Sequence, residues 1–494
     1  MKSKTSQKTN KHPDWRLSRS EKSWYYVGDT ARLFCSSLVA SYMTIFLMLQ
    51  GINMASLATA MLVVKIIDSV DDVLFGFIID KFDIRKWKIV SKLAGDGKYM
   101  PWYRLFFWTF PLAAILFYMM PKNSPDAVKI AWFFVTYLLY DFTCTLTEVP
   151  MQSMVTTLTD SPTERNSILT VKGVITVIAA VGMSIVVSAL LSEKVGISMS
   201  TIGIVGALIF LVFMLPMVFK VHEHNTELKN VEQEGSQEQY TFMDMLRCVT
   251  TNKYILIYFL AVIVSTLLCT RIAVESFIGF YIFHDSMTFT YVMLIGFVPG
   301  IILSGFCGKI ADKIGKRNFL AGIFLLLCAA HLILFFFGRD SKAFFIVIGG
   351  LCAIPNALVS VVRTYIAPDT IDYTRYKTGK DCSGIFYSLQ SFINKVLNGV
   401  VGSFALYMLA LNGWKEVQGE SFADLAAQGV TQSQQALDAL WNLGYLFPAI
   451  GFAFASVLLF AFYRLKDKDA ALMSQCNAGK ITREECEAQL SRKY

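Results

Sequence analysis

Three aspartates stand together inside an otherwise apolar stretch of the chain, in the segment 65–81 that reads KIIDSVDDVLFGFIIDK. Asp68 and Asp72 are four residues apart and share one face of a helix, with Asp71 beside them and Lys65 one turn earlier. Each ionised side chain near the centre of a membrane helix costs about 2.5–3.5 kcal/mol. These acids therefore need a base, a bound cation or protonation. The spacing predicts either a structural ion pair with a base such as Lys65 or a cation site inside a helix bundle.

A further acid, Glu148, lies in the middle of another apolar segment and is followed by Pro150. Proline frees backbone groups of a helix, which a membrane tolerates where the helix lines a cavity. We expect Glu148 either to line such a cavity or to pair with a base on a neighbouring helix, for which Lys172 is available. Asp29 and Arg32, three residues apart, fit either an interfacial pair or the wall of a cavity.

Charged residues also occur in the apolar segments of the second half of the chain. Arg271 and Glu275 are four residues apart on one helix face, which favours an intrahelical ion pair over a contact with a solute. Lys395 lies about a dozen residues into a later apolar segment. A lysine at that depth needs an acid, and the acids of segment 65–81 can supply it.

The composition of the whole chain is too apolar for a soluble protein. Of its 494 residues, 54% are hydrophobic, and the mean hydropathy is +0.49. We predict an all-α polytopic membrane protein with about twelve transmembrane helices. The predicted spans are residues 27–50, 54–79, 102–120, 127–150, 168–192, 200–219, 253–282, 288–307, 318–337, 343–366, 384–411 and 440–463.

Lysine and arginine collect before Trp24 and in the even-numbered connections between these spans, whereas the odd-numbered connections are short and poor in basic residues. Because basic loops stay in the cytoplasm, both termini are predicted to be cytoplasmic. This bias accounts for the net charge of +8, so we expect a lipid bilayer around the protein and no nucleic-acid partner. The sequence has no Gly-x-x-x-x-Gly-Lys-Ser/Thr loop for ATP, and its spans show no nucleophile–base pair. An enzyme is therefore not expected.

The string Gly-x-Ile-x-Asp-Lys closes both the second and the eighth predicted span, at residues 76–81 and 308–313. Its recurrence six spans apart predicts two six-helix halves related by a repeat. The expected division is a cytoplasmic leader at 1–26, an N-terminal six-helix bundle at 27–220, a cytoplasmic loop at 221–252, a C-terminal bundle at 253–463, and a cytoplasmic tail at 464–494 that forms one helix.

Taken together, these strings resemble the glycoside–pentoside–hexuronide:cation symporters, a family of the major facilitator superfamily. The matching residues run from the first to the eleventh span in the family's order. They are Asp68-x-x-x-Asp72 leading to Gly76 and Asp80, Gly97-Lys98-Tyr99-x-Pro101-Trp102, Glu148-Val149-Pro150, Glu164-Arg165, Asp369-x-x-Asp372-Tyr373, and Tyr387-Ser-x-Gln390 followed by Lys395.

The resemblance implies a cation site. Asp68 and Asp72 would ligate the coupling ion with help from Thr145, and Lys395 would lie close to them. Carboxylates and a hydroxyl suit a hard metal cation, so these three residues would be metal ligands if the protein uses sodium. A buried carboxylate can equally carry a proton, which leaves Na⁺ and H⁺ both open.

The resemblance also implies a solute site on the first, fourth and fifth spans. Glu148 matches the acid on the fourth span, and Gln152 stands where the family has an aromatic residue. Arg32 keeps the base on the first span, although Leu33 replaces the neighbouring acid. Lys172 replaces an arginine, which removes bidentate geometry. Five further residues at cytoplasmic ends match gating positions: Asp80, Arg165, Asp312, Asp369 and Asp372.

We therefore expect a secondary active transporter that couples symport of a sugar or glycoside to Na⁺ or H⁺ by alternating access. The resemblance implies a bacterial plasma membrane and no cofactor besides the coupling ion. Two alternatives stay open. A lipid or lysolipid transporter can use the same fold, and a transport-inactive sensor would bind its solute without cation-dependent uptake.

Overall fold

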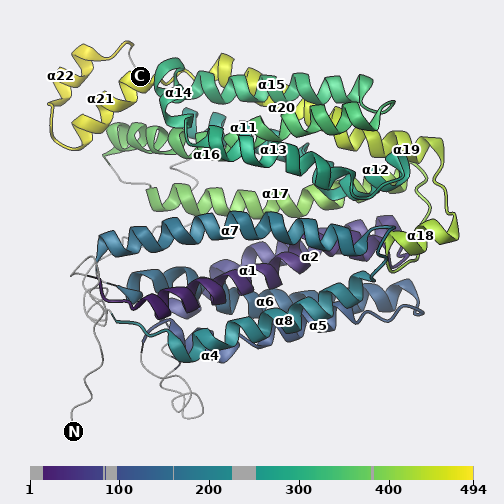
Figure 1. Ribbon diagram of the computed structural model, residues 1–494. Helices are drawn as coiled ribbons and strands as arrows, with labels where there is room; N and C mark the ends of the chain where they lie inside the picture. The colour runs from purple at the N-terminus through teal and green to yellow at the C-terminus, as the bar shows by residue number, and fades with distance from the viewer. Residues whose placement is uncertain are drawn as a thin grey trace, which may run out of the picture. The chain divides into compact units, whose positions relative to one another are not determined.

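The computed structural model describes residues 15–81, 84, 97–159, 161–224, 252–379 and 383–492. For Asp71, Asp72 and Asp80 it describes the backbone only, and most of the predicted leader and central loop lies outside it. The elements of the described residues are helices (Figure 1). They form two compact units. The first is drawn from Met1–Phe46, Ile67–Leu190 and Ile197–Gln237, and the second from Leu47–Ile66, Leu191–Gly196 and Glu238–Tyr494.

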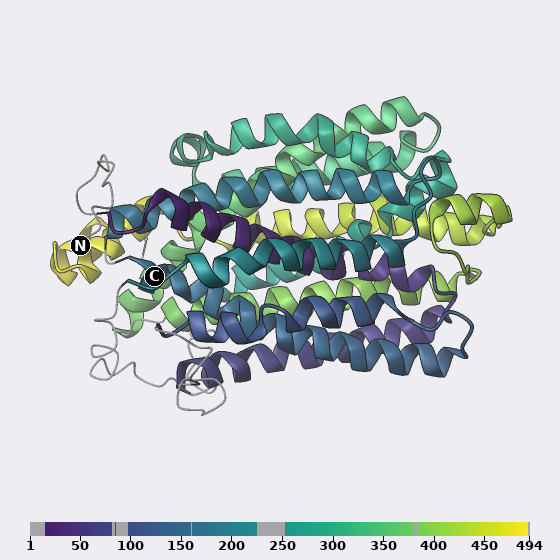
Figure 2. The same ribbon diagram turned by 60° about the horizontal axis from the view of Figure 1, so that its bottom comes forward.

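The first unit is built from long apolar helices that pack against one another through aromatic and small residues. α5 packs against both α6 and α8. Figure 2 shows the long helices running side by side. A Cβ atom at Gly203 would lie 2.2 Å from the Tyr118 ring, so the glycine permits this close approach. The Tyr118 hydroxyl donates to the carbonyl of Leu38 at 2.7 Å. The helices are α1 (Arg19–Met48), α2 (Met54–Lys81, in this unit from Ile67), α4 (Met100–Phe106), α5 (Thr109–Tyr118), α6 (Asp126–Leu158), α7 (Pro162–Leu191) and α8 (Met199–Lys220).

The second unit has its own apolar core, in which α15 packs against α16 and α20. Its spans are more often interrupted than those of the first unit. The helices are α11 (Lys253–Leu267), α12 (Arg271–Phe283), α13 (Thr288–Ser304), α14 (Cys307–Ile314), α15 (Lys316–Phe337), α16 (Lys342–Thr378), α17 (Ser383–Leu411), α18 (Phe422–Gln428), α19 (Gln434–Trp441), the π-helix η2 (Asn442–Leu446), α20 (Phe447–Phe462), α21 (Asp467–Asn477) and α22 (Arg483–Gln489).

The all-helical, multi-span fold predicted from the sequence is confirmed. Within the described residues, nine helices are long and apolar enough to cross a membrane, and α13 with α14, bent by 62°, makes a tenth. α2 does not pass this test because Lys65 and the aspartates of this helix give it too many charged residues. The third predicted span is divided into α4 and α5, each too short alone. Pro111, in the first turn of α5, cannot donate to the carbonyl of Phe107 and so favours the break.

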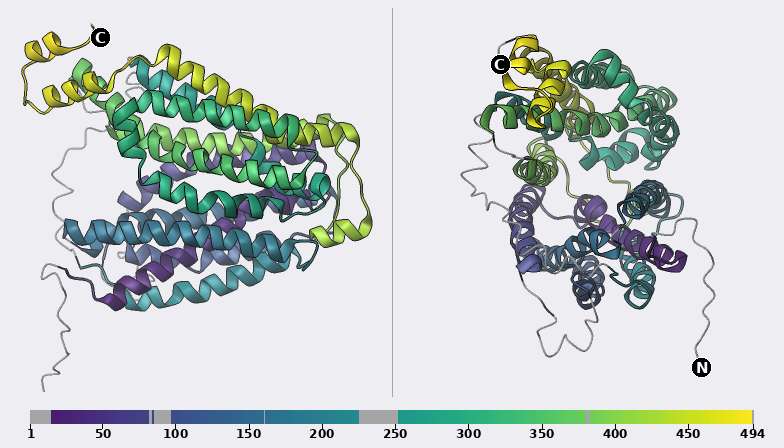
Figure 3. Two further views of the ribbon diagram at one scale, coloured as in Figure 1. Left: turned by 45° about the horizontal axis from the view of Figure 1, so that its top comes forward. Right: turned by 90° about the vertical axis from the view of Figure 1, so that its left-hand side faces the viewer.

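The predicted seventh span, 253–282, corresponds to Lys253–Phe283, which is long and apolar enough to cross a membrane although α11 and α12 are separated at residues 268–270. The expectation of a single helix in the tail is wrong. The tail contains two helices, α21 and α22, instead of one (Figure 3). α21 packs against α16, and its side chains Met473 and Asp469 are buried. The turn that begins α22 is closed by a capping box between Thr482 and Glu485. The tail is therefore a folded part of the second unit.

Candidate functional site

Three helices of the first unit bring four charged side chains together. On α1, Arg32 Nη2 lies 3.4 Å from Asp29 Oδ1. Arg32 Nη1 lies 3.5 Å from Oε2 of Glu148 on α6, and Nζ of Lys172 on α7 lies 3.1 Å from Asp29 Oδ2. The two acids and two bases sum to zero charge, which lowers the cost of holding them within a membrane bundle. We call these residues the α1–α6–α7 charge cluster.

Arg32 is the centre of this cluster, and its hydrogen bonding is incomplete. Its side chain is 2% exposed, and within the described part of the chain its Nε and Nη1 atoms have no hydrogen-bond partner. A guanidinium offers five N–H donors, whereas Arg32 makes one long hydrogen bond to Asp29. Buried donors without acceptors are costly. Arg32 can therefore donate to the oxygens of a hydroxyl-rich solute.

Glu148 and Gln152 form the accessible edge of the cluster. The Gln152 amide donates to Glu148 Oε1 at 2.8 Å, and the Glu148 side chain is 41% exposed. These residues are four apart on α6, so both project from the same helix face. The structure thus brings Arg32, Glu148, Gln152 and Lys172 into one site. The base that pairs with Glu148 is Arg32. Lys172, which the sequence offered as the partner of Glu148, pairs with Asp29.

Asp68, on α2, contacts a second part of α6. The Tyr137 hydroxyl donates to Asp68 Oδ2 at 3.3 Å, and Asp68, Asp141 and Thr145 are all buried. Because a helix turns about 100° per residue, positions 137, 141, 145, 148 and 152 fall within about 80° of one another around the axis. One polar face of α6 therefore carries both the partner of Asp68 and the acid of the charge cluster.

The other predicted parts of the cation site are only partly described. Asp72 lies in α2 one turn after Asp68, and its side chain is outside the described residues. Thr145 is buried on the polar face of α6. Lys395 is half-buried on α17, in the second unit. The proximity of Lys395 to the acids of α2 stays a prediction.

Sequence reasoning missed a role for Tyr137 and Asp141 and left that of Asp29 open. Asp29 binds both Arg32 and Lys172. Tyr137 and Asp141 precede Thr145 by eight and four residues, so a search for polar residues in helical register would have found them. The pairing of Asp29 with Lys172 depends on how α1 and α7 are rotated, and the sequence carries no signal for that rotation.

At the predicted cytoplasmic end of the first unit, Glu164 anchors the chain that precedes α1. This fully buried carboxylate accepts the backbone N–H groups of Arg16 and Leu17 at 2.9 and 3.2 Å, and the Thr159 hydroxyl at 2.6 Å. Lys22 Nζ lies 2.7 Å from it. The neighbouring predicted gating residue, Arg165, donates to the carbonyls of Thr156 and Thr159. The Glu164 carboxylate thus connects the loop between α6 and α7 to the start of the described chain.

Replacing Glu164 by alanine is expected to loosen this anchor. Four donors would lose a buried acceptor, at about 1–3 kcal/mol for each donor left unsatisfied. We expect trypsin to cut the purified protein after Arg16 and Lys22 at least about fivefold faster, since local opening controls cleavage. Glu484→Ala, at an exposed position of α22, is the matched control and should leave the rate unchanged. Equal rates for both variants would contradict the anchor.

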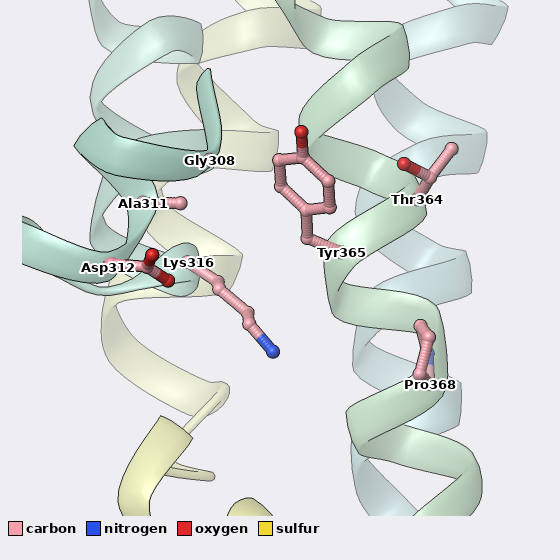
Figure 4. Close-up of a pocket in the computed structure, with 7 residues that line it drawn as sticks. All are labelled: Gly308, Ala311, Asp312, Lys316, Thr364, Tyr365 and Pro368. Carbon is pink, nitrogen blue, oxygen red and sulfur yellow. The ribbon is translucent and has the colours of Figure 1, made fainter. Parts of the chain in front are cut away.

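One predicted gating residue of the second unit, Asp312, lines a pocket of about 300 Å³ between α14 and α16. Figure 4 shows Asp312 and Lys316 on one wall and Thr364, Tyr365 and Pro368 on the other. Lys316 Nζ lies 2.7 and 2.8 Å from the two oxygens of Asp369, and its backbone N–H donates to Asp467 of the tail at 2.8 Å.

Two other predicted gating residues are placed differently. Asp372 contributes its backbone carbonyl, which accepts the Asn477 amide at 2.9 Å. The side chain of Asp80 lies outside the described residues. Lys316, which begins α15 and was not predicted as a site residue, therefore links α16 to the tail.

Comparison with known proteins gives the family. The family model described as MFS/sugar transport protein matches residues 24–467, which is most of the chain. The chain belongs to this family. The resemblance to the glycoside–pentoside–hexuronide:cation symporters is thereby confirmed, and the protein is a multi-pass membrane transporter and not an enzyme.

Curated relatives cover nearly the whole chain at low identity. The isoprimeverose transporter of Lactiplantibacillus pentosus is 25% identical over 454 residues, which cover 90% of this chain and 88% of that protein. The glucuronide carrier protein homolog of Escherichia coli (strain K12) is 24% identical over 453 residues, covering 90% and 92%.

Solved structures with the same fold are more distant in sequence. The nucleoside transporter NupG superimposes with a TM-score of 0.58 at 12% identity, covering 90% of this chain and 99% of that one. An inward-facing bacterial homologue of the lysosomal transporter Spinster gives 0.60 at 10% identity, covering 90% and 97%. These similarities support the major facilitator fold.

Proposed function

We propose that this protein is a symporter that couples the uptake of a sugar or glycoside to the entry of Na⁺ or H⁺ by alternating access. The observation that carries the proposal is the polar face of α6. Thr145 and Glu148 lie three residues apart on it, about 4.5 Å along the axis. Thr145 faces the same side as the Tyr137 hydroxyl bonded to Asp68, and Glu148 belongs to the charge cluster around Arg32.

In this proposal, the cation neutralises Asp68 and Asp72 and so removes most of the cost of burying two carboxylates. The solute then binds at the neighbouring cluster, where its hydroxyl oxygens accept from Arg32 and its hydroxyl groups donate to Glu148. Because both sites share one helix, ordering of α6 by the cation favours the solute, and the solute favours the cation by the same factor.

The membrane potential supplies the driving force for a neutral solute. One cation crossing about 100 mV releases roughly 2.3 kcal/mol, which supports an accumulation of about 50-fold. The curated relatives named for isoprimeverose and glucuronides support a glycoside as the solute. We further propose a plasma-membrane location with both termini in the cytoplasm, on the basis of the basic residues in the leader and the even-numbered connections.

The proposal is tested with the purified protein in lipid vesicles, using radiolabelled glycosides and an imposed Na⁺ or H⁺ gradient applied separately. We expect one gradient to drive uptake. Glu148→Gln should reduce uptake about 10- to 150-fold, because a charge-assisted hydrogen bond to the solute is worth about 1.5–3 kcal/mol. Glu484→Gln, at an exposed position of the tail, should transport normally. Absence of glycoside uptake under both gradients would contradict the proposal.

A further inference from the structure

The two helices of the tail bring two cysteine side chains into contact. Cys476 lies in the last turn of α21 and Cys486 lies in α22, and the two helices pack against each other (Figure 1). Both cysteines are reduced, and their thiols are hydrogen-bonded to each other. Cys486 is a fully buried member of the apolar core of the second unit, and Cys476 packs against that core while keeping part of its surface exposed.

The turn between the two helices fixes the thiols in this position. Gly479 has a φ of 70°, its N–H donates to the carbonyl of Cys476 at 3.0 Å, and the N–H of Lys480 donates to the carbonyl of Gln475 at 2.9 Å. These two bonds are the Schellman pattern that ends a helix and turns the chain. The capping box at Thr482 then begins α22. The contact between the cysteines therefore follows from a short, well-defined helical hairpin.

Both cysteines lie next to bonds that join the tail to α16. Asn477, the residue after Cys476, donates its amide to the carbonyl of Asp372 at 2.9 Å. The Tyr376 hydroxyl of α16 is hydrogen-bonded to Cys486. Asp372 is one of the predicted gating residues. A covalent link between the thiols would therefore fix two neighbouring contacts on the helix that carries this residue.

We propose that Cys476 and Cys486 form a redox-modification site, which a small-molecule disulfide oxidises reversibly to an intramolecular disulfide that clamps the tail onto α16. The contact lies within the second unit. The inference concerns the tail alone, so its failure leaves the proposed symport untouched, and failure of the symport leaves this site untouched.

The reaction is two successive thiol–disulfide exchanges. Cys476 reacts first, because it is the more exposed thiol and burial raises the pKa of Cys486. Its thiolate attacks one sulfur of the small disulfide, which releases one small thiol and leaves a mixed disulfide on Cys476. The sulfur of Cys486 then attacks the Cys476 sulfur and releases the second small thiol. Two electrons and two protons pass from the protein to the small disulfide.

Peptide mapping of the purified full-length protein tests the link directly, with oxidised glutathione as the oxidant. The remaining thiols are then alkylated and the unfolded protein is digested. Trypsin cuts inside the segment that the disulfide would close, after Lys480 and Arg483, and so places the two cysteines in the separate peptides 469–480 and 484–492.

We expect these two peptides as one species that is lighter by two hydrogen atoms than their sum and that separates on reduction. This species should exceed any other cysteine pairing at least about tenfold, because the short intervening segment gives the two thiols a high effective concentration. Recovery of both peptides unlinked, glutathione on Cys476 without the link, or equal amounts of other pairings would overturn the site.

Hydrogen exchange of the α22 amides tests the clamp. In the unchanged protein, oxidation should slow this exchange at least about fivefold, because the link removes open states of the hairpin. Cys476→Ser and Cys486→Ser should each abolish the linked species and make the exchange insensitive to the oxidant. Cys476→Ser is the variant less able to disturb folding, since this side chain is only partly buried.

The matched control is Cys328→Ser, which removes a buried thiol of α15 from the same core. It should keep both the linked species and the slowing. An oxidant effect on α22 that persists in Cys476→Ser would overturn the clamp, and so would unchanged exchange in the unchanged protein once the disulfide has formed.

Discussion

Asp68→Asn is expected to abolish gradient-driven accumulation of the solute. Asparagine keeps the shape of the side chain and can still accept the Tyr137 hydroxyl, which lies 3.3 Å from Asp68 Oδ2. It loses the negative charge that would attract a metal cation and the basic oxygen that would take a proton. We expect the ratio of internal to external solute in vesicles to fall to about 1, since no ion gradient is then coupled to transport.

The measurement is solute accumulation under the gradient that drives the unchanged protein, followed by exchange of labelled for unlabelled solute without a gradient. Asp72→Asn should give the same loss. Asp340→Asn, an exposed carboxylate between α15 and α16, controls for nonspecific effects of removing an acid. Undiminished accumulation by Asp68→Asn would show that the coupling ion binds elsewhere.

Arg32→Gln is expected to destabilise the first unit as well as to abolish uptake. The substitution leaves Asp29 with Lys172 and leaves Glu148, whose side chain is 41% exposed, without a base. Removal of one partner from a fully buried pair costs about 3–5 kcal/mol, and solvent at Glu148 makes the cost smaller here. A clear fall in the thermal midpoint of the purified protein should therefore accompany the loss of transport.

A second substitution separates the two effects. Asp29→Asn combined with Arg32→Gln restores zero net charge, because Glu148 and Lys172 remain. We expect the double variant to regain most of the thermal stability but no uptake, since the guanidinium donors for the solute are still missing. Arg32→Lys keeps the charge and loses the fork of donors, so it should be stable and transport poorly. Full uptake by the double variant would exclude Arg32 from the solute site.

Much of the fold could be predicted from the sequence because membrane helices follow from composition. Long apolar segments and the distribution of lysine and arginine predict the spans, and the spacing of Asp68 and Asp72 predicts a shared helix face. The interruption between α11 and α12 contains neither glycine nor proline. It is accompanied by a hydrogen bond from the Thr270 hydroxyl to the carbonyl of Leu443, a contact between distant segments that no local pattern contains.

The candidate site was predicted as a set of residues but not as a set of pairs. Arg32, Glu148, Gln152 and Lys172 were each identified from spacing or from the family resemblance, and the structure places them together. Which base binds which acid depends on the rotation of α1, α6 and α7 about their axes. Neighbouring residues on a helix point about 100° apart, so rotating one helix by that angle would change every pair it makes. Hydrophobic periodicity defines the direction of a helix face less precisely than this angle.

The polar face of α6 also has an evolutionary consequence. Glu148 and Gln152 are at its accessible end, about one turn and two turns beyond Thr145, respectively. Under the proposed assignment of the two sites, a mutation at either of these two positions alters which solute fits without changing Tyr137, Asp141 or Thr145. A lineage of such transporters could then acquire new nutrients by single substitutions while it inherits the proposed ion-binding end of the helix unchanged.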